Sequence, residues 1–552
     1  MKILSCDYLI VGAGASGCVL ASRLSENPDN QVILLEAGGD DYSPFLRVPG
    51  LGFAAGAIAK YNWNFLLEPI PALHDRQMVL LEGKVMGGSS SINGMIYTRG
   101  HSREYDQWRD MGCDGWGFED TRPYFLRSEA NFRGAGDWHG AVGPMPLRRA
   151  NPRLPICDAF LEAAGAAGFP IVDDLNANHA EGLGWYDVNI HHGLRMSAAR
   201  SFLKPASRRK NLKIITRTEA LKVLFSRAKA TGIEARQGNQ RITFAAAREV
   251  ILCAGAIKSP QLLMLSGIGP SDELRKFGIE VSAHSPQVGK NLQNHPCYRP
   301  RYACSQPVTA RNHISATGML RAGISYVVSR TGPLAESFAS VGGFFKSEAS
   351  LSHADMQVVM LSALPPKGAQ GVLDMLPKEQ GFGLTIYQGT PYSRGEVGLR
   401  SADPLAAPVI RSGYFSDPRD IEVLARGVER MRQVMLRPEI AKYISGAIAP
   451  PSQVRSHAEL IDEIRREAAT SYHQSGTCAM GPDAGAVLDA RLRVRGVDGL
   501  RVADTSIIPR LPNAAMHAPA LMIGEKAAAM ILDDAEQGAP RETGERRSLW
   551  KR

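Results

Sequence analysis

The first 36 residues alternate short apolar runs with glycine-rich and polar turns. Residues 7–11 (DYLIV) and 31–36 (QVILLE) are predicted strands, because short apolar runs bounded by turn residues are typical of buried strands. The turn GAGASG (12–17) and the apolar run CVLASRLSE (18–26), a predicted helix, lie between them. This order of strand, turn, helix and strand predicts a βαβ unit with two parallel strands.

The glycines of this turn each meet a separate requirement of a bound dinucleotide. Gly12 allows the tight turn, Gly14 lets the backbone approach a pyrophosphate, and Gly17 lets helix and strand pack closely. The start of the helix adds N–H groups and the positive end of the helix dipole. Glu36 closes the second strand, where a carboxylate can bind both hydroxyls of an adenosine ribose. The predicted contacts of this unit are Gly12, Ala13, Gly14, Gly17, Glu36 and Ala37.

A second run rich in glycine and serine, GKVMGGSSSING (83–94), follows later in the chain. Such a run is too flexible to pack as a core element unless something fills the space beside its backbone. An ordinary surface loop is one interpretation of this run. An extended flavin dinucleotide, which needs backbone contact along its ribityl and ring portions, explains the run better and favours FAD over NAD.

Composition and charge exclude several other classes of protein. The chain has 552 residues, 44% of them hydrophobic, which is enough for a large core and for either more than one domain or one domain with large insertions. Its formal net charge is +9, but Lys and Arg are dispersed apart from SRRK (207–210) and the tail at 541–552, so nucleic-acid binding is not expected. The N-terminus passes directly into a strand, and no apolar run reaches about 18 residues. We therefore expect no signal peptide, no transmembrane segment and a cytoplasmic protein.

The cysteines show no CxxC pair and no clustering with histidine. This pattern is typical of reduced, buried thiols, and it predicts neither a disulfide framework nor a metal site. The eight cysteines are Cys6, Cys18, Cys113, Cys157, Cys253, Cys297, Cys304 and Cys478.

With its two glycine-rich motifs, extended as LLEAG and MIYTRG, the chain resembles the glucose-methanol-choline (GMC) oxidoreductases, flavoproteins that oxidise alcohols. The resemblance covers about residues 5–533, and the chain looks most like bacterial choline- and alcohol-dehydrogenase-like members. It implies bound FAD and oxidation of an alcohol. Further matching motifs follow in the order of the family: GAIKSPQLLMLSGIG (255–269), VGKNLQNHP (288–296), SRGEVGLRSADP (393–404) and LRVADTSIIP (500–509).

The dinucleotide motifs are split along the chain, at 7–100, 248–261 and 500–506, so one domain is predicted to assemble from separated segments. The predicted fold class is α/β, with a Rossmann-like FAD-binding domain. The resemblance implies a second, α+β substrate domain on an antiparallel sheet that covers the flavin. We place the FAD-binding domain at 1–155, 196–297 and 471–535, the substrate-binding domain at 156–195 and 298–470, and a basic tail at 536–552.

Two elements of the second domain are predicted from periodicity. SRGEVGLRS (393–401) alternates like a half-buried strand. A helix is predicted over 418–435, with Asp417 as its cap and Pro418 in its first turn. Its apolar residues recur at the spacing of one helix face, at Ile421, Leu424, Val428, Met431 and Met435.

The resemblance also implies contacts to the flavin portion of the cofactor. In members that hold FAD covalently through a histidine, the attachment residue sits just before the Asn of the glycine-serine run, and here that residue is Ile92. We therefore predict non-covalent FAD. A purely structural cap is the alternative role of Asp504. The implied contacts are Val85, Gly88, Asn93, Met95, Ala220 (through its backbone) and Asp504.

Oxidation of an alcohol by flavin needs a base, because hydride leaves the carbon readily only if the hydroxyl proton leaves in concert. Histidine suits this role, since its ordinary pKa of about 6.5 leaves much of it neutral at pH 7. By the resemblance, His473 in SYHQSGTCAMG (471–481) matches the catalytic histidine of the family. His517 matches a second position that holds histidine or asparagine. A solvated loop histidine and a helix-capping side chain are the structural alternatives.

We predict that the substrate hydroxyl lies between these two rings, that His473 removes its proton, and that the hydride passes to the flavin. His517 would hydrogen-bond the same oxygen. The 44 residues from His473 to His517 are enough for the chain to extend away from the flavin and come back to it, so both rings can meet over one face of the flavin. His295, in NLQNHP, is predicted to be structural.

The expected partners are a small-molecule alcohol and either dioxygen or a quinone-like electron acceptor. The residues do not separate an oxidase from a dehydrogenase, and they leave the oligomeric state open. Phe and Tyr in 336–347 and 385–393 favour an alcohol with an apolar or aromatic body, although aromatic residues in strands often belong to the core. A non-redox lyase on the same fold is the alternative function. A flavin-binding protein without chemistry and a nicotinamide enzyme are further interpretations.

Overall fold

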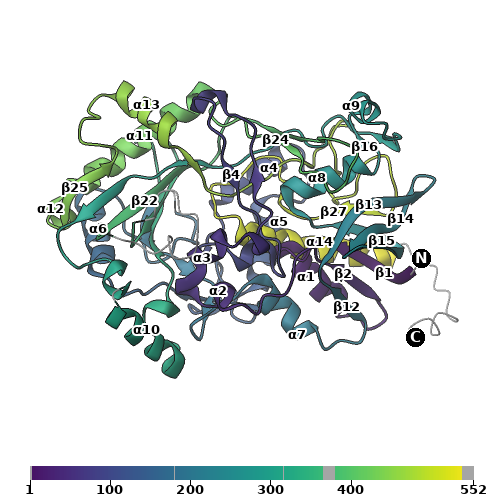
Figure 1. The fold of residues 1–552 in the computed structure, drawn as a ribbon, viewed down its shortest axis with the longest axis horizontal. Helices are drawn as coiled ribbons and strands as arrows, with labels where there is room; N and C mark the ends of the chain where they lie inside the picture. The colour runs from purple at the N-terminus through teal and green to yellow at the C-terminus, as the bar shows by residue number, and fades with distance from the viewer. Residues whose placement is uncertain (1–2, 180, 315, 365–378, 538–552) are drawn as a thin grey trace.

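The computed structural model describes residues 3–179, 181–314, 316–364 and 379–537, so most of the predicted basic tail lies outside the described residues. None of the helices in these ranges is long and apolar enough to cross a membrane. The first large sheet joins strands from both ends of the chain (Figure 1). In spatial order its strands are β12 (Leu212–Ile215), β2 (Val32–Leu35), β1 (Ile3–Val11), β15 (Gln240–Leu252), β14 (Lys229–Gln237) and β13 (Thr218–Ser226), and β27 (Leu500–Val502) also pairs with β15.

The predicted βαβ unit lies at the centre of this sheet. Helix α1 (Ala15–Leu24) connects β1 to β2, and these two strands pair in parallel. Strand β1 begins at Ile3, before the predicted start at residue 7, because its first half also pairs with β15 (Ile3↔Thr243). The sheet is parallel from β12 to β15 and β27, while β13 and β14 extend it as antiparallel strands.

The second large sheet is antiparallel and occupies the other half of the molecule in Figure 1, where helices surround it. A parallel-based sheet and an antiparallel sheet with helices confirm the predicted α/β fold class. In spatial order its strands are β25 (Ile444–Ala449), β19 (Arg301–Cys304), β22 (Gly381–Gln388), β21 (Met356–Leu361), β20 (Ala339–Phe345) and β8 (Gly182–Trp185), and β18 (Pro296–Tyr298) pairs with both β22 and β26 (Ala469–Thr470).

Side chains alternate between the two faces of the second sheet. One face belongs to an apolar core shared with α6 (Pro155–Ala166), α11 (Pro418–Met435) and α13 (His457–Glu467). Residues at the alternating positions of β21 and β22 face the other way and line a cavity. Burial of one face by helices therefore leaves the other face free to cover a ligand.

Helix α11 begins and ends where the sequence predicts. The Asp417 carboxylate accepts a hydrogen bond from the Arg419 backbone N–H at 3.0 Å, which confirms the predicted cap. The predicted apolar face is buried in the core. The predicted strand at 393–401 is present only as β23 (Glu396–Gly398), because its hydrogen-bonded partner β24 (Val409–Arg411) is equally short.

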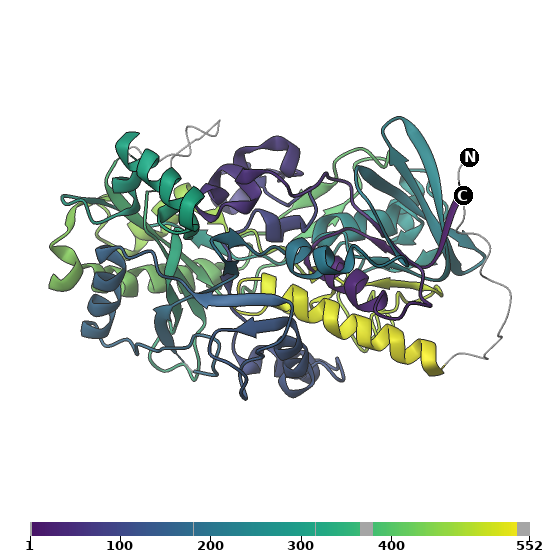
Figure 2. The ribbon, with the colours of Figure 1, turned by 90° about the horizontal axis from the view of Figure 1, so that it is seen from below.

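Helix α14 (His517–Gln537) packs along α1, and Figure 2 shows it lying lengthwise across the molecule. The Ser16 hydroxyl of α1 donates a hydrogen bond to the Ala520 carbonyl oxygen at 2.7 Å. Arg23 Nε and Nη2 bind the buried Glu525 carboxylate at 2.8 and 2.7 Å. These contacts hold the start of α14 beside the helix that follows the first glycine turn.

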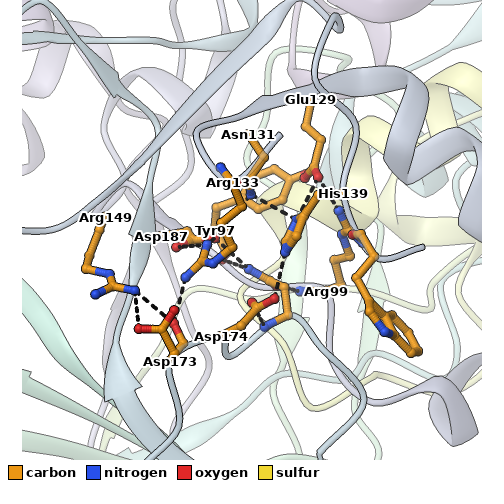
Figure 3. Close-up of polar contacts among 12 residues, drawn as sticks. Tyr97, Arg99, Glu129, Asn131, Arg133, His139, Arg149, Asp173, Asp174 and Asp187 are labelled. Carbon is orange, nitrogen blue, oxygen red and sulfur yellow. Dashed lines mark hydrogen bonds and ion pairs between the residues drawn. The ribbon is translucent and has the colours of Figure 1, made fainter. Parts of the chain in front are cut away.

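A buried ionic network follows strand β5 (Ile96–Tyr97), as Figure 3 shows. Arg99 Nη2 lies 2.5 Å from Glu129, and both side chains are fully buried. His139 lies between two carboxylates, with Nδ1 3.0 Å from Glu129 and Nε2 2.7 Å from Asp174. Burial lowers the pKa of His139, but the hydrogen bonds to these carboxylates outweigh burial and raise the pKa to about 9.

We expect the His139 ion pairs to make stability depend on pH. The folded pKa of about 9 lies above the ordinary value of 6.5, so the stabilisation is complete below pH 6.5 and is lost as the pH rises through 9. A His139→Gln variant keeps hydrogen bonding without the charge. Because one pKa unit corresponds to about 1.4 kcal/mol, its stability deficit should shrink by about 2–3 kcal/mol between pH 6 and pH 9. Differential scanning calorimetry of both proteins at the two pH values measures this, and an unchanged deficit would contradict it.

Candidate active site

A cavity of about 890 Å³ is lined by residues of both sheets and their connecting loops. Within the described ranges, no group of three or more His, Cys, Asp or Glu side chains could hold a metal ion. Three residues predicted as cofactor contacts, Ala13, Gly17 and Val85, lie outside the lining. The predicted site residues that line this cavity are Gly12, Gly14, Glu36, Ala37, Gly88, Asn93, Met95, Ala220, His473, Asp504 and His517.

The first glycine turn is close-packed on one side and open on the other. Gly12 has φ of 101°, and a Cβ there would lie 2.4 Å from the Cys253 carbonyl oxygen. A Cβ on Gly17 would lie 2.0 Å from the Gly12 carbonyl oxygen. At Gly14 the nearest atom would be 3.8 Å away, and this residue lines the cavity. The turn therefore leaves space for a ligand beside its backbone at Gly14.

The second glycine-rich run lies directly against the first. The Gly87 N–H donates to the Ala13 carbonyl oxygen at 2.8 Å. A Cβ on Gly88 would lie 2.8 Å from the Cα of Gly14. The 83–94 run is thus held in the fold by the first glycine turn itself, and both motifs border the same cavity.

Glu36 lies at the end of β2, where the sequence predicts a ribose contact. Its carboxylate accepts hydrogen bonds from the N–H groups of Ala13 at 2.9 Å and Gly38 at 2.7 Å. Burial raises the pKa of Glu36 to about 7, although these two hydrogen bonds by themselves lower it. Each carboxylate oxygen keeps a lone pair that can accept from a ribose hydroxyl.

Asp504 lines the cavity, as a cofactor contact would. Its carboxylate also caps backbone N–H groups, which is the structural role given above as the alternative. Its Oδ1 accepts from the Ser506 N–H at 2.8 Å. Its Oδ2 accepts from the Gly255 N–H at 2.9 Å and from the Ser259 hydroxyl at 2.6 Å, at the start of α8 (Gly255–Leu265). This carboxylate therefore joins the segment after β27 to the helix after β15.

A buried arginine that the sequence did not single out holds the loop at Asn93. Arg195 Nη1 donates to the backbone and side-chain oxygens of Asn93 at 2.6 and 2.7 Å. The Met95 N–H donates to the same Asn93 side chain at 3.1 Å. Burial lowers the pKa of Arg195 to about 9, and no carboxylate in the described part of the chain pairs with it. No local pattern marks this residue, because its neighbours in space lie about a hundred positions away.

His473 is hydrogen-bonded to another imidazole, that of His295. Their Nδ1 atoms are 2.8 Å apart, and His295 Nε2 lies 2.7 Å from the Gly389 carbonyl oxygen. The carbonyl can only accept, so His295 Nε2 carries the hydrogen and its Nδ1 is the acceptor. Burial keeps His295 neutral by lowering its pKa well below 6.5. His473 therefore carries its hydrogen on Nδ1, and its Nε2 holds a lone pair.

The backbones of the two histidine segments are joined as well. The Asn294 side-chain oxygen accepts from the N–H groups of His295 and His473, each at 2.8 Å. The Tyr387 ring stacks on His295, with centroids 4.8 Å apart, and meets His473 edge-on at 5.7 Å. Burial lowers the pKa of His473 to about 4, so this ring is neutral at pH 7. The sequence predicted a structural role for His295, and the structure adds that its ring contacts His473.

His517 is the first residue of α14 and is 7% exposed. Neither of its ring nitrogens has a hydrogen-bond partner among the residues that the structure describes. Burial and the nearby Arg195 lower the pKa of His517 to about 4. The Tyr97 ring meets it edge-on at 6.4 Å. A buried imidazole with two unpartnered nitrogens on the cavity is suited to bind a ligand oxygen.

A family model described as GMC oxidoreductase matches residues 6–297, and a second model of the same description matches residues 391–524. The chain belongs to the GMC oxidoreductase family, as the sequence motifs predict. Members of this family bind FAD, and the chain is an oxidoreductase that acts on CH–OH donors.

Two curated relatives are oxygen-dependent choline dehydrogenases. The chain is 38% identical over 532 residues to the one from Sinorhizobium medicae and 38% identical over 531 residues to the one from Brucella anthropi. Each alignment covers 96% of both chains. These relatives match the chain over almost its whole length.

Solved structures show the same architecture. Pyridoxine 4-oxidase from Mesorbium loti has a TM-score of 0.85 and 30% identity, covering 95% of this chain and 98% of that one. A formate oxidase has a TM-score of 0.90 and 24% identity, covering 97% and 100% of the two chains. The formate oxidase, at this identity, is similar in fold alone.

We expect His295 to be a positioning residue for His473. A His295→Leu variant removes the acceptor of the His473 Nδ1–H, so the ring can turn its lone pair away from the cavity. The loss of such a hydrogen bond should slow flavin reduction by an alcohol about tenfold.

The matched control is His295→Gln, whose amide can both accept from His473 and donate to the Gly389 carbonyl oxygen. Stopped-flow reduction without oxygen, at equal flavin content, compares the variants. Equal losses in the Leu and Gln variants would show that His295 acts only through packing.

Proposed function

We propose that the protein oxidises an alcohol to a carbonyl compound, with FAD as the hydride acceptor, His473 as the base and His517 as a second contact to the alcohol oxygen. One observation carries this proposal: two neutral imidazoles line one cavity, and one of them is held with its Nε2 lone pair unengaged by any described residue. Such a pair can take a proton from an oxygen and bind that oxygen at the same time.

The residues present fit FAD. The open backbone at Gly14 would hold the pyrophosphate, and the start of α1 would supply N–H groups to it. A Cβ on Gly94 would meet no atom within 4 Å, which leaves room for a flat ring beside the loop that Arg195 holds. When bound, FAD supplies the acceptor for the hydride.

The proton transfer follows from the tautomers. His473 accepts the hydroxyl proton at Nε2, because its Nδ1 already carries a hydrogen. The resulting cation keeps its Nδ1–H bonded to His295, which disperses the charge. His517 donates from one ring nitrogen to the alcohol oxygen, and a fixed donor strengthens as negative charge develops on that oxygen.

The relatives support a small alcohol as the substrate. Choline dehydrogenation and pyridoxine oxidation are the activities named for proteins 38% and 30% identical to this chain. The name oxygen-dependent in the first of these supports dioxygen as an acceptor, with a quinone-like compound as the other class. A lyase would keep the flavin, but no alcohol would reduce it.

We expect His473→Ala to leave a folded, yellow protein that alcohols reduce about 10²–10⁴-fold more slowly, since this is the typical contribution of a positioned base. Stopped-flow bleaching of the flavin band without oxygen, across a panel of alcohols, measures the rates. Near-normal reduction would reject the base assignment.

His517→Asn and His517→Ala form a matched pair for the second imidazole. Asn keeps a donor to the alcohol oxygen and should retain more activity than Ala. If no alcohol bleaches the flavin of the unmodified enzyme, oxidation itself is rejected in favour of the lyase.

We expect the flavin to be released when the protein is denatured with acid. Ile92 lines the cavity where covalent members carry a histidine, and its side chain offers no nucleophile. After trichloroacetic acid precipitation, the absorbance near 450 nm should appear in the supernatant, as for any free oxidised flavin. A yellow pellet would refute non-covalent binding.

A further inference from the structure

The second sheet brings one unexpected cation to the cavity lining, Arg299. This residue directly follows β18, and its Nη2 donates to the Thr470 carbonyl oxygen at 3.0 Å. Cys297 and Tyr472 lie beside its guanidinium. Its neighbours at 470–472 immediately precede His473, so this cation belongs to the substrate side of the cavity.

No carboxylate accompanies Arg299. Among the described residues it forms no ion pair. The carboxylates that line the cavity all contact the dinucleotide-binding motifs or α8. These four are Glu36 against Ala13, Asp504 against Gly255, Glu82 also against Gly255, and Glu219 against Lys258.

Arg299 is partly buried, an arginine is charged at every physiological pH, and removing a charge from water is costly unless an opposite charge meets it. Its planar guanidinium presents paired N–H donors that match the two oxygens of a carboxylate. A ligand with an anionic oxygen group would offset the cost of removing the guanidinium charge from water. A quaternary ammonium group at the same place would meet repulsion and no compensating acid.

The remaining surface on this side of the cavity is mostly apolar. It comes from the 92–96 loop and from the second sheet with the segment before β20. A flat or branched hydrocarbon body would be buried there. The apolar side chains are Ile92, Ile96, Phe338, Val359 and Leu361.

We propose that the substrate is an alcohol whose apolar body carries a carboxylate, and that Arg299 binds this carboxylate while the hydroxyl reaches His473 and His517. The inference rests on the proposed alcohol oxidation and names its substrate class. It separates this chain from its choline-oxidising relatives, whose substrate carries the opposite charge.

Equilibrium binding tests the charge preference without any turnover. The flavin-loaded enzyme is titrated by calorimetry with 3- and 4-methylbenzoate and with the matching methylbenzamides, which have the same shape and no charge. The benzoates should bind about 10- to 100-fold more tightly, the range of a charge-assisted hydrogen bond. Arg299→Gln should remove this preference, and Arg299→Lys should keep part of it, since the charge remains but the paired donors do not.

Turnover tests the same point with 3- and 4-(hydroxymethyl)benzoate, their amides and choline. The carboxylates should give the highest kcat/KM, and Arg299→Gln should lower kcat/KM for them while leaving the amides within about threefold. The inference is overturned if neither carboxylate is preferred over its amide. It is also overturned if Arg299→Gln slows amides and carboxylates alike, because the cation would then act on the flavin.

These outcomes are separate from failure of the proposed function. If the neutral amides and choline reduce the flavin in a His473-dependent way and the carboxylates show no advantage, alcohol oxidation holds and the role of Arg299 fails. If no alcohol reduces the flavin, the function itself fails.

Discussion

The hydrogen bond between the imidazoles of His295 and His473 is the interaction on which the proposed chemistry of the cavity depends. Because the Gly389 carbonyl can only accept, both rings donate in one direction, from His473 at the cavity to His295 and from His295 to the Gly389 carbonyl oxygen after β22. The basic nitrogen of His473 is therefore determined by three segments that are far apart in sequence. Burial lowers the pKa of His295 well below 6.5, so this ring is neutral at pH 7 and the order is kept there.

The second imidazole reaches the cavity by a different route. His517 starts α14, and the packing of α14 on α1 places that start beside the dinucleotide-binding turn. Helix packing positions the ring and leaves its nitrogens unpartnered among the described residues. One ring is thus held by hydrogen bonds and the other by packing, an arrangement suited to one base and one adaptable donor.

The charged side chains in the cavity lining come from different segments of the chain. The acidic side chains contact the glycine motifs and α8, where they also hold backbone N–H groups. The second sheet contributes Arg299 and apolar side chains. In the proposed complex, Arg299 would meet the substrate carboxylate while the glycine motifs hold the dinucleotide.

The sequence by itself determined the elements whose signals are local: the βαβ unit, helix α11 with its Asp417 cap, and the order of motifs that defines the family. Through the family resemblance, the sequence also predicted His473 and His517 as site residues. Only the tertiary structure decided that His295 contacts His473, that Arg195 holds Asn93 and that Arg299 has no described acid beside it. The physical reason is that periodicity and turn chemistry act over a few residues, whereas a tautomer or an unpaired charge depends on neighbours that folding brings from a hundred or more positions away.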